Sequence, residues 1–415
     1  MNRLPHTCLA DVERLSPPAD VASPGAAASP GVPTPQVDVR LTEACPRQQG
    51  IALGAALQTQ IAVAERSLLE YEAFRLHQPW WMPYSLFQYM AQWRARSLLE
   101  PEIGEAFPDI RERICGMAEG ARTSVDFLYL FHALESASTA AERENPNLAA
   151  CTAVAASGVR TRDGRPLLAH NFDLVPTASP LLTLREARCP GSLQYLAMSL
   201  APMAGLIDGV NEAGLAITYN YAPTTDTCAN RPPISLSIDR ALATCHTVTQ
   251  AIQLLSSTPR GGGALLMLAD AQGDIAALEL SANCSAVRRP AKRRLLHHSN
   301  AYHTPTLREC EMPRTAVYGE DAPAALRGVS IFESALQRDL RMAKRLQTTT
   351  APLDAETVAH LMADHGPDQQ PSANTICMHG SHWSTLASVQ MFPAERRIRV
   401  SYGAACQAEF QDFQL

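Results

Sequence analysis

The stretch "CTAVAASGVRTRDGRPLLAHNFDLVP", residues 151–176, decides the fold of this chain of 415 residues. Two apolar runs flank the polar turn "TRDGRP", and such a pattern predicts a β-hairpin. The second strand ends in "HNFD", so the hairpin brings Asn171 and Asp173 back towards the residue that opens the first strand. That residue is a cysteine, Cys151, which is therefore a candidate for chemistry as well as for packing.

Three later stretches have the same form of apolar run, polar turn and apolar run. They are "LIDGVNEAGLAITYNYAP" (206–223), "ALLMLADAQGDIAALELS" (264–281) and "TLASVQMFPAERRIRVSYG" (385–403). Apolar residues at helical spacing mark 236–257 and 330–347 between them, and most of 48–138 before the first hairpin. Hairpins with intervening helices predict an α+β fold in which helices cover antiparallel sheets.

Composition divides the chain into three parts. Residues 1–45 include "PPADVASPGAAASPGVPTP" and have almost no large apolar residue, which predicts a disordered tail. Residues 46–150 form a predicted helical segment, and residues 151–415 carry the predicted sheets. A hydrophobic fraction of 46% over this length is enough for a large core.

Charge and apolar content argue against several classes of function. A net charge of −6 gives no general attraction to nucleic acid, and we expect the short basic run at 288–294 to be a solvated turn. No window reaches the roughly 18 apolar residues of a membrane span. The first residues lack the apolar centre of a signal peptide. We therefore expect a cytoplasmic protein with no nucleic-acid or membrane partner.

The eleven cysteines are scattered along the chain, and no two stand at CxxC spacing. This spacing suggests neither a zinc site nor a thioredoxin-type motif. We expect no metal and no organic cofactor, and we expect most of these thiols to be inert core residues.

Cys151 has two interpretations. A cysteine in an apolar strand is usually structural, yet this one follows the loop-like segment "ENPNLAA", where a chain could be cut. If the bond between Ala150 and Cys151 were broken, the thiol would share its residue with an α-amine of pKa about 8, which is a usable base. Asp173 could hold that amine in place. A Cys–His pair would have to draw on twelve histidines, none of which stands in a motif that points to it.

Six stretches in order carry a resemblance to a known family. They are Cys151-Thr152, "DGRPLLAHNFD" (163–173), "GLIDGVNEAGLAITYN" (205–220), "LADAQGDIAALELS" (268–281), "HHSNAYHTP" (297–305) and "TLASVQMFPAERRIRVSYGAAC" (385–406). In this order and spacing they resemble the cysteine N-terminal-nucleophile hydrolases, in particular the autoproteolytic isopenicillin N acyltransferase-like family. The resemblance covers nearly everything from about residue 48 to 406, and "GMAEGA" (116–121) fits that family's helical pro-segment.

The resemblance implies an αββα four-layer sandwich of two antiparallel sheets, preceded by a helical N-terminal pro-segment. It implies a precursor that cuts itself between Ala150 and Cys151. The fragments 1–150 and 151–415 would then stay associated. Assembly into a homo-oligomer is also compatible with the sequence.

The resemblance also implies four catalytic roles. Cys151 is the nucleophile and its freed amine the base. Asp173 matches the carboxylate beside the amine. Asn300, in "HHSN", matches the asparagine whose side-chain N–H helps to form the oxyanion hole, and Asn220, in "TYNY", matches a position that lends a second donor.

Several further residues are expected to contact substrate. His170 stands where bile-salt hydrolases have an arginine, and Asn171 follows it. Tyr221, Ser384 and Thr385 lie in neighbouring motifs. Thr177 and Arg185 are further candidates, in the variable loop at 175–191.

The family implies attack of Cys151 on an amide or thioester carbonyl, an acyl-enzyme, and transfer of the acyl group to water or an amine. The donor would be a small amide, an acyl-CoA or an N-acyl amino compound. Two alternatives stay open: a choloylglycine or penicillin V amidase, and an unprocessed binding protein of the same fold. "HWSTLASVQ" (382–390) lacks the arginine that the amidases carry there, which favours the acyltransferase-like branch.

Overall fold

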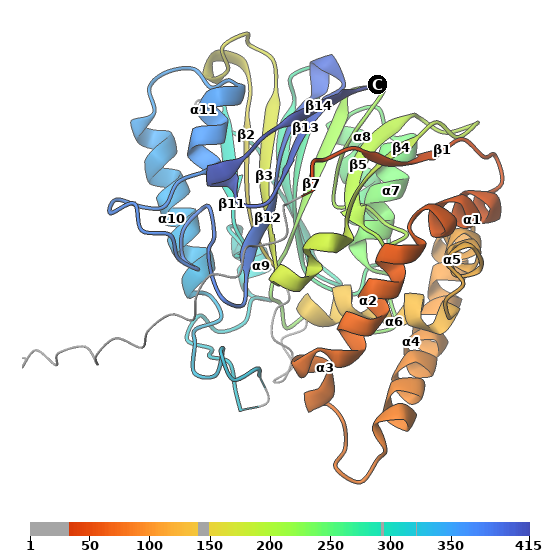
Figure 1. Cartoon of the computed structure of the whole chain (residues 1–415). Helices are drawn as coiled ribbons and strands as arrows, with labels where there is room; N and C mark the ends of the chain where they lie inside the picture. The colour runs from red at the N-terminus through yellow and green to blue at the C-terminus, as the bar shows by residue number, and fades with distance from the viewer. Residues whose placement is uncertain (1–32, 140–148, 292–293, 321) are drawn as a thin grey trace, which may run out of the picture. The chain divides into compact units, whose positions relative to one another are not determined.

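The computed structural model of the chain describes residues 33–139, 149–291, 294–320 and 322–415. Two β-sheets lie face to face at its centre (Figure 1). The larger sheet has the order β1 (Val37–Leu41), β4 (Leu182–Ala187), β5 (Tyr195–Leu200), β6 (Asp208–Asn211), β7 (Leu215–Tyr221), β8 (Ala264–Asp270), β9 (Ile275–Leu280) and β10 (Ser285–Arg288). The smaller has the order β11 (Leu295–His298), β2 (Ala149–Ala156), β3 (Leu167–Leu174), β12 (Ser384–Phe392), β13 (Arg397–Tyr402) and β14 (Gln411–Gln414).

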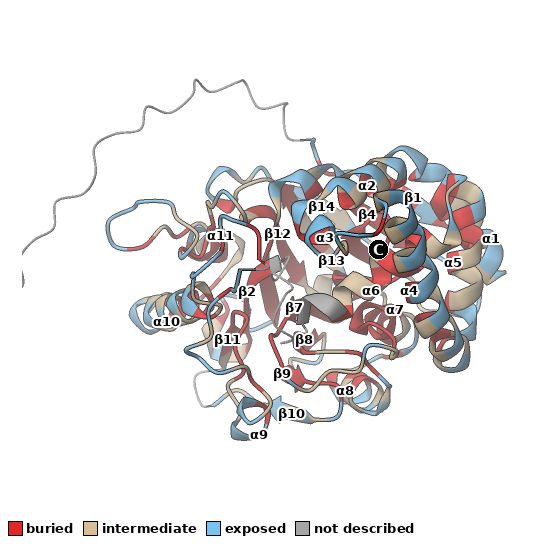
Figure 2. Ribbon diagram, turned by 90° about the horizontal axis from the view of Figure 1, so that it is seen from below, coloured by how far each residue is buried: buried red, intermediate tan, exposed pale blue. Residues whose placement is uncertain are grey.

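Helices cover the outer face of each sheet. Helices α7 (Ile234–Thr244) and α8 (Val248–Ser257) pack on β6 to β9 of the larger sheet, and α10 (Glu333–Thr348) and α11 (Ala355–Met362) pack on β2, β3 and β11 of the smaller. The short helix α9 (Pro305–Arg308) contacts β10. In cross-section the layers are helix, sheet, sheet and helix, so the predicted αββα sandwich is confirmed, and buried residues concentrate in its two inner layers (Figure 2).

The four predicted hairpins are all present. They are β2–β3, β6–β7, β8–β9 and β12–β13, each with antiparallel pairing. Strand β2 begins at Ala149, two residues before Cys151, so the prediction that the cysteine opens its strand was wrong in position. Alternation along β2 and β3 directs Cys151 and Phe172 towards the larger sheet, and Val154 and Ala169 towards α10 and α11.

The predicted tail ends earlier than residue 45. Strand β1 pairs in parallel with β4 at the edge of the larger sheet. The prediction that both sheets are antiparallel was therefore wrong for this edge. Val39 and Leu41 are buried, and the Asp38 carboxylate accepts a hydrogen bond of 2.8 Å from the backbone N–H of Leu184. Burial of alternate side chains stabilises this short strand. Residues 1–32 lie outside the described part of the chain.

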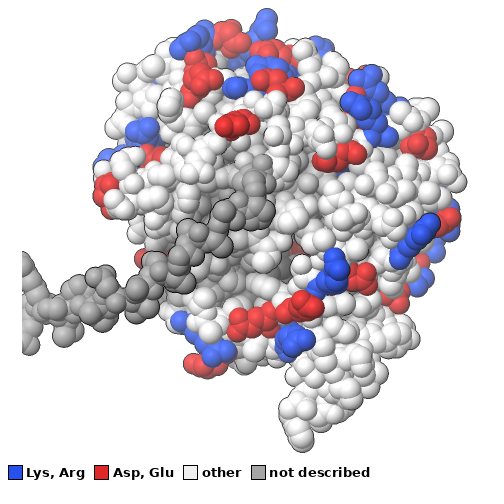
Figure 3. All heavy atoms as spheres, in the orientation of Figure 1, with Lys and Arg blue, Asp and Glu red and all other residues white. Residues whose placement is uncertain are grey.

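The segment before β2 is helical, as predicted. Its helices are α1 (Pro46–Ala56), α2 (Gln58–Glu70), α3 (Glu72–Leu76), α4 (Tyr84–Ala106), α5 (Pro108–Ala121) and α6 (Val125–Thr139). Residues 77–93, which link α3 to α4 and form the start of α4, contain no Asp, Glu, Lys or Arg, and the region stands out as a projection without these residues (Figure 3). Within the described residues, none of the helices is both long and apolar enough to span a bilayer.

Helices α1 and α5 cross at four glycines. A Cβ added at Gly50 would lie 2.1 Å from the Arg113 carbonyl oxygen, and one at Gly120 would lie 2.2 Å from the Ile51 carbonyl oxygen. Gly54 and Gly116 meet backbone atoms of the opposite helix just as closely. Only glycine permits this approach, because backbone atoms cannot rotate away as a side chain can.

We expect Gly120→Ala to destabilise the chain by about 1–3 kcal/mol, because the new methyl group forces α1 and α5 apart. Thermal unfolding of the full chain measures this as a lower Tm. Gly104→Ala in α4 is the matched control: its new Cβ meets only the flexible Arg111 side chain, 3.0 Å away. Since alanine is favoured over glycine within a helix, the control should keep or raise the Tm. Equal Tm values for the two variants would contradict the role of the glycine crossing.

Candidate active site

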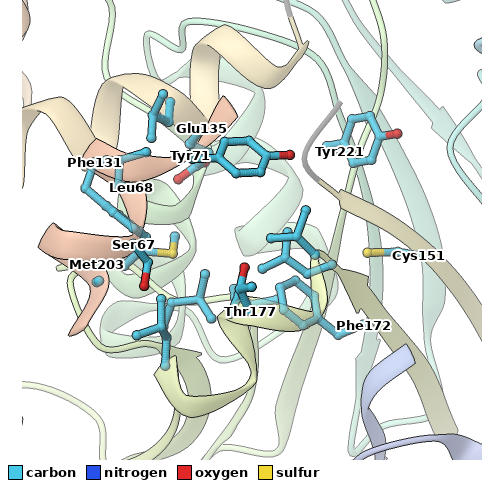
Figure 4. Close-up of a pocket in the computed structure, with 18 of the residues that line it drawn as sticks. Ser67, Leu68, Tyr71, Phe131, Glu135, Cys151, Phe172, Thr177, Met203 and Tyr221 are labelled. Carbon is cyan, nitrogen blue, oxygen red and sulfur yellow. The ribbon is translucent and has the colours of Figure 1, made fainter. Parts of the chain in front are cut away.

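Cys151 is buried in β2, with 1% of its surface exposed, and its thiol forms part of the wall of a cavity (Figure 4). The cavity measures about 160 Å³. Most of its lining is apolar, and among the lining residues are Ala64, Leu68, Phe131, Leu134, Phe172, Leu174, Val175, Ala178, Leu181, Leu200, Met203 and Ile207. The helices α2 and α6 and the strands β2, β3 and β7 all contribute. Residues on both sides of the predicted cut thus build one cavity.

His170 lies beside Cys151 on the inner face of the same hairpin. In the β2–β3 register Cys151 is opposite Phe172 and Ala153 is opposite His170, so the cysteine and the histidine are diagonal neighbours on one face. The Nδ1 atom of His170 lies 2.8 Å from Oδ2 of Asp208, which comes from β6 of the other sheet. Both side chains are fully buried. The structure therefore contains a Cys–His–Asp series that links the two sheets.

The charges of this series are set by burial and by each other. Burial alone lowers the pKa of His170, but Asp208 and the Cys151 sulfur raise it to about 10. Burial raises the pKa of the Cys151 thiol, and His170 counteracts part of that rise. No well-aligned hydrogen bond joins Nε2 of His170 to the thiol, although the two groups are close enough to shift each other's pKa. Asp208 thus favours the cationic form of His170, which in turn lowers the pKa of the Cys151 thiol against the larger effect of burial.

Arg338 of α10 holds the backbone around Cys151 from the opposite face. Its guanidinium donates to the Cys151 carbonyl oxygen, to the Thr152 hydroxyl at 2.9 Å and to Oδ1 of Asn300 at 2.8 Å. Its side chain is 1% exposed, and Nη1 lies 4.0 Å from Oδ2 of Asp173. Because a buried cation is costly unless it is fully paired, these contacts fix its position.

Asn300 binds the nitrogen of the candidate nucleophile. Its Oδ1 atom accepts a hydrogen bond of 3.0 Å from the backbone N–H of Cys151, and its Nδ2 atom donates to the Tyr221 carbonyl oxygen at 2.9 Å. One of the two N–H donors of its amide group is therefore engaged in the uncut chain. The oxyanion-hole role of Asn300 stays a prediction. Asn220 donates from Nδ2 to the Ser299 carbonyl oxygen at 2.8 Å, which positions the residue next to Asn300; its oxyanion role also stays a prediction.

Asp173 points to the face that carries Arg338. Its Oδ1 atom accepts a hydrogen bond of 2.6 Å from the Thr385 hydroxyl, and its Oδ2 atom makes no hydrogen bond within the described residues. Burial raises the pKa of Asp173 to about 7, against the opposing effect of Arg338. An amine freed at Cys151 would supply a cation near this carboxyl group, because Ala150, the preceding residue, is the register partner of Asp173.

The other expected substrate contacts divide into two groups. Tyr221 and Thr177 line the cavity. Asn171 does not: it donates to the carbonyl oxygens of Met362 and Ile376, at 2.8 and 3.0 Å, and accepts from Ser388. The lining residues likewise exclude Ser384, Thr385 and Arg185. Thr385 acts on Asp173, Ser384 bonds the Gly380 carbonyl oxygen, and the Arg185 guanidinium binds carbonyl oxygens at 200–203.

Two members of the site, Arg338 and Asp208, were not predicted from the sequence. Each left a signal, because each is a charged residue within an apolar pattern. Arg338 shares the buried stripe of α10 with Ala335, Met342 and Leu346, and Asp208 interrupts the apolar run "GLIDGV".

The expected cleavage site lies inside β2. Ala150 is 4% exposed and packs with Tyr318, Met378 and Trp383. Cleavage before Cys151 would make Ala150, which pairs with Asp173 of β3, the last residue of the first fragment. The segment at 140–148, which precedes this site, lies outside the described residues.

The model of the family "acyl-coenzyme A:6-aminopenicillanic acid acyl-transferase" matches residues 159–405. The match spans more than half of the chain, so the chain belongs to this family of N-terminal-nucleophile proteins, and the resemblance found in its motifs is confirmed. The matched range contains Asp173 and Asn300 and begins after Cys151. A search of curated protein sequences gave no match.

Solved structures give weaker similarities. One is a Caenorhabditis elegans ortholog of N-acylethanolamine-hydrolyzing acid amidase, with 14% identity and TM-score 0.42, covering 59% of this chain and 93% of that one. Another is penicillin V acylase from Agrobacterium tumefaciens, with 16% identity and TM-score 0.39, covering 64% and 86%. A third is a mutant of the conjugated bile acid hydrolase from Clostridium perfringens, with 14% identity and TM-score 0.35, covering 64% and 97%. Similarity at this level does not bear on the substrate.

We expect His170→Asn to slow alkylation of Cys151 by iodoacetamide at neutral pH. Loss of the imidazolium raises the thiol pKa further, and each unit lowers the thiolate fraction about tenfold. Peptide mass spectrometry across a pH series, on chains in the same cleavage state, measures the rate at Cys151 alone. Asp208→Asn should also slow the alkylation of Cys151 at neutral pH. His360→Gln, which removes an exposed histidine, should leave the pH dependence of alkylation unchanged. An unchanged profile in His170→Asn would refute the coupling.

Proposed function

We propose that the chain is a self-cleaving N-terminal-nucleophile acyltransferase or amidohydrolase, with Cys151 as the nucleophile. One observation carries the proposal: the two reactive groups of Cys151 already have separate, suitable surroundings. The thiol faces an apolar cavity beside His170. The backbone nitrogen, which cleavage would turn into an amine, is held by Asn300, itself held by Arg338.

Self-cleavage would proceed by attack of the Cys151 sulfur on the Ala150 carbonyl carbon. A C–S bond forms, the peptide C–N bond breaks, and the thiol proton ends on the Cys151 nitrogen. Water then hydrolyses the thioester, which leaves a carboxylate on Ala150 and returns the thiol. In this scheme the His170 cation stabilises the attacking thiolate, and the raised pKa of Asp173 lets its carboxyl group exchange protons near neutral pH.

The mature site would use the same atoms for turnover. The new amine takes the thiol proton as the sulfur attacks a substrate carbonyl, and it returns the proton to the leaving group. The acyl group then stays on Cys151 as a thioester until water or an acceptor amine attacks. Hydrolysis and acyl transfer share this intermediate and differ only in the acceptor.

The cavity favours an apolar acyl group. Its lining is hydrocarbon over most of its surface, with hydroxyl-bearing side chains at Ser67, Tyr71, Thr177, Tyr219 and Tyr221. It has one carboxyl group, Glu135, whose pKa burial raises to about 7. An aliphatic or aromatic acyl chain would replace water in this space at a gain of about 0.8 kcal/mol for each buried CH₂ group. An anionic acyl chain would find no cation among the lining residues, which include no Lys, Arg or His.

We expect the purified wild-type chain to separate into fragments of residues 1–150 and 151–415 under denaturing conditions. Cys151→Ala should remain a single chain of 44.9 kDa, because no nucleophile is left. Cys245→Ala removes a different buried cysteine and should be cut like the wild type. Intact-mass spectrometry gives both results. An uncut wild-type chain after prolonged incubation, or a cut Cys151→Ala chain, would refute self-cleavage.

We expect Ser67→Phe to shift the preferred acyl chain to shorter lengths. Ser67 lies across the cavity from Cys151 (Figure 4), so a larger side chain shortens the space beyond the thiol. For each methylene that no longer fits, kcat/KM should fall about tenfold or more. Competition among acyl donors of graded length measures the shift. Ser97→Phe, on the exposed face of α4, is the control and should keep the wild-type order of preference. The same order in Ser67→Phe would exclude this cavity as the acyl site.

A further inference from the structure

Four potential metal ligands gather on the far side of the smaller sheet, apart from the cavity. They are His365, which follows α11, Cys377 and His379 from one segment, and Cys406 from the 3₁₀ turn at Ala405–Gln407. Their ligand atoms all lie within 4.8 Å of one another. The cluster joins three parts of the chain that are separate in sequence.

The spacing within this cluster suits a tetrahedral ion. The Cys377 sulfur lies 3.3 Å from Nε2 of His379, and the Cys406 sulfur lies 3.5 Å from the same atom. A tetrahedral Zn²⁺ holds sulfur at about 2.3 Å and nitrogen at about 2.0–2.1 Å, so its ligand atoms lie roughly 3.3–3.8 Å apart. The two measured separations fall in this range, and contraction of the widest pair would complete the site.

His365 supplies an independent sign of a missing partner. Its Nε2 atom is buried and makes no hydrogen bond within the described residues. Its ring stands 5.1 Å from the ring of His379, at an angle of 77°. A buried ring nitrogen without a partner is costly, and a metal ion between the two rings would remove that cost.

We propose that His365, Cys377, His379 and Cys406 bind one Zn²⁺ ion in a structural site. Two thiolates and two imidazoles form one of the ligand sets of structural zinc. All four positions are filled by protein, so the ion has no open position for a substrate. Cys377 is fully buried and Cys406 is exposed, which leaves a short path for the ion from solvent.

A second cluster, Asp226 with Cys284 and Cys310, is a weaker candidate for a zinc site. The Asp226 carboxylate already accepts hydrogen bonds from the Ser281 hydroxyl and from the backbone and side chain of Asn283. Only two thiols remain, fewer than a closed zinc site needs. This cluster serves as a control.

The proposed ion would stabilise the segment that positions Thr385, the hydrogen-bond donor to Asp173. Met378, between two of the ligands, donates its backbone N–H to the Thr385 hydroxyl at 2.9 Å and accepts the Thr385 N–H at 3.0 Å. The same Thr385 hydroxyl donates to Asp173. The Asn171 side chain ties β3 to Met362 and Ile376, at the two ends of the segment that carries His365. Loss of the ion should therefore loosen the segment behind the active site.

The expectation of no metal site rested on the missing CxxC spacing. CxxC spacing identifies sites in which one short turn supplies two ligands. The ligands proposed here stand at 365, 377, 379 and 406. Only "CMH" at 377–379 places two of them close in sequence.

The test is the metal content of the full chain, purified without a histidine tag under reducing conditions after growth with added zinc. We expect about one zinc per chain by elemental mass spectrometry. Cys406→Ser should lower this at least tenfold, and because Cys406 is exposed this variant should fold even if Cys377→Ser does not. Cys310→Ser, in the control cluster, should keep the full zinc content. Cobalt added to the metal-free chain should give the absorption of a tetrahedral thiolate complex.

Three results would overturn the proposal. One is a wild-type chain that binds no zinc in direct titration. Another is a disulfide between Cys377 and Cys406 in the freshly purified, unreduced chain. The third is equal zinc content in Cys406→Ser and wild type. None of these readouts depends on catalysis, so failure of the zinc site and failure of the proposed enzyme function are distinguishable.

Discussion

A buried arginine, Arg338, is the constraint on which the geometry of the site depends. It comes from a helix outside the smaller sheet, yet it binds the Cys151 carbonyl oxygen, the Thr152 hydroxyl and Asn300. Asn300 in turn holds the Cys151 nitrogen. A guanidinium suits this task because its donors have a fixed planar arrangement and it stays charged when buried. The position of both backbone groups of Cys151 thus follows from the packing of α10 on the sheet.

The alternation of a β-strand then separates the two reactive groups of one residue. The side chain of Cys151 faces the larger sheet, where His170 and Asp208 bridge the layers. Its backbone nitrogen is held by Asn300, next to Arg338 and Asp173 on the helical side. The thiol has an apolar cavity and a cation beside it, and the nitrogen has polar partners. The two environments lie on opposite faces of the strand but remain electrostatically coupled, because Asp173 raises the pKa of the Cys151 thiol and His170 lowers the pKa of Asp173.

Local patterns in the sequence predicted what lies close along the chain. The alternation of apolar residues in 151–176 predicted the hairpin, and with it the approach of Asp173 to the strand that carries Cys151. The order of the motifs predicted the family. The partners that come from elsewhere were not predicted. Asp208 belongs to the other sheet and Arg338 to a later helix, so only the packed layers place them. Strand β1 was missed because its partner β4 lies far along the chain, and a Pro- and Ala-rich segment precedes it.

The central claim is that Cys151 carries the acyl group during turnover, and trapping that acyl-enzyme tests it most directly. The chain would be incubated with acyl amides and acyl thioesters that have apolar chains, quenched in acid and digested for peptide mass spectrometry. The account predicts the added acyl mass on a peptide that begins at Cys151, lost again when an acceptor amine is supplied before quenching. Turnover with the acyl mass on another residue, or turnover that persists in Cys151→Ala, would contradict it.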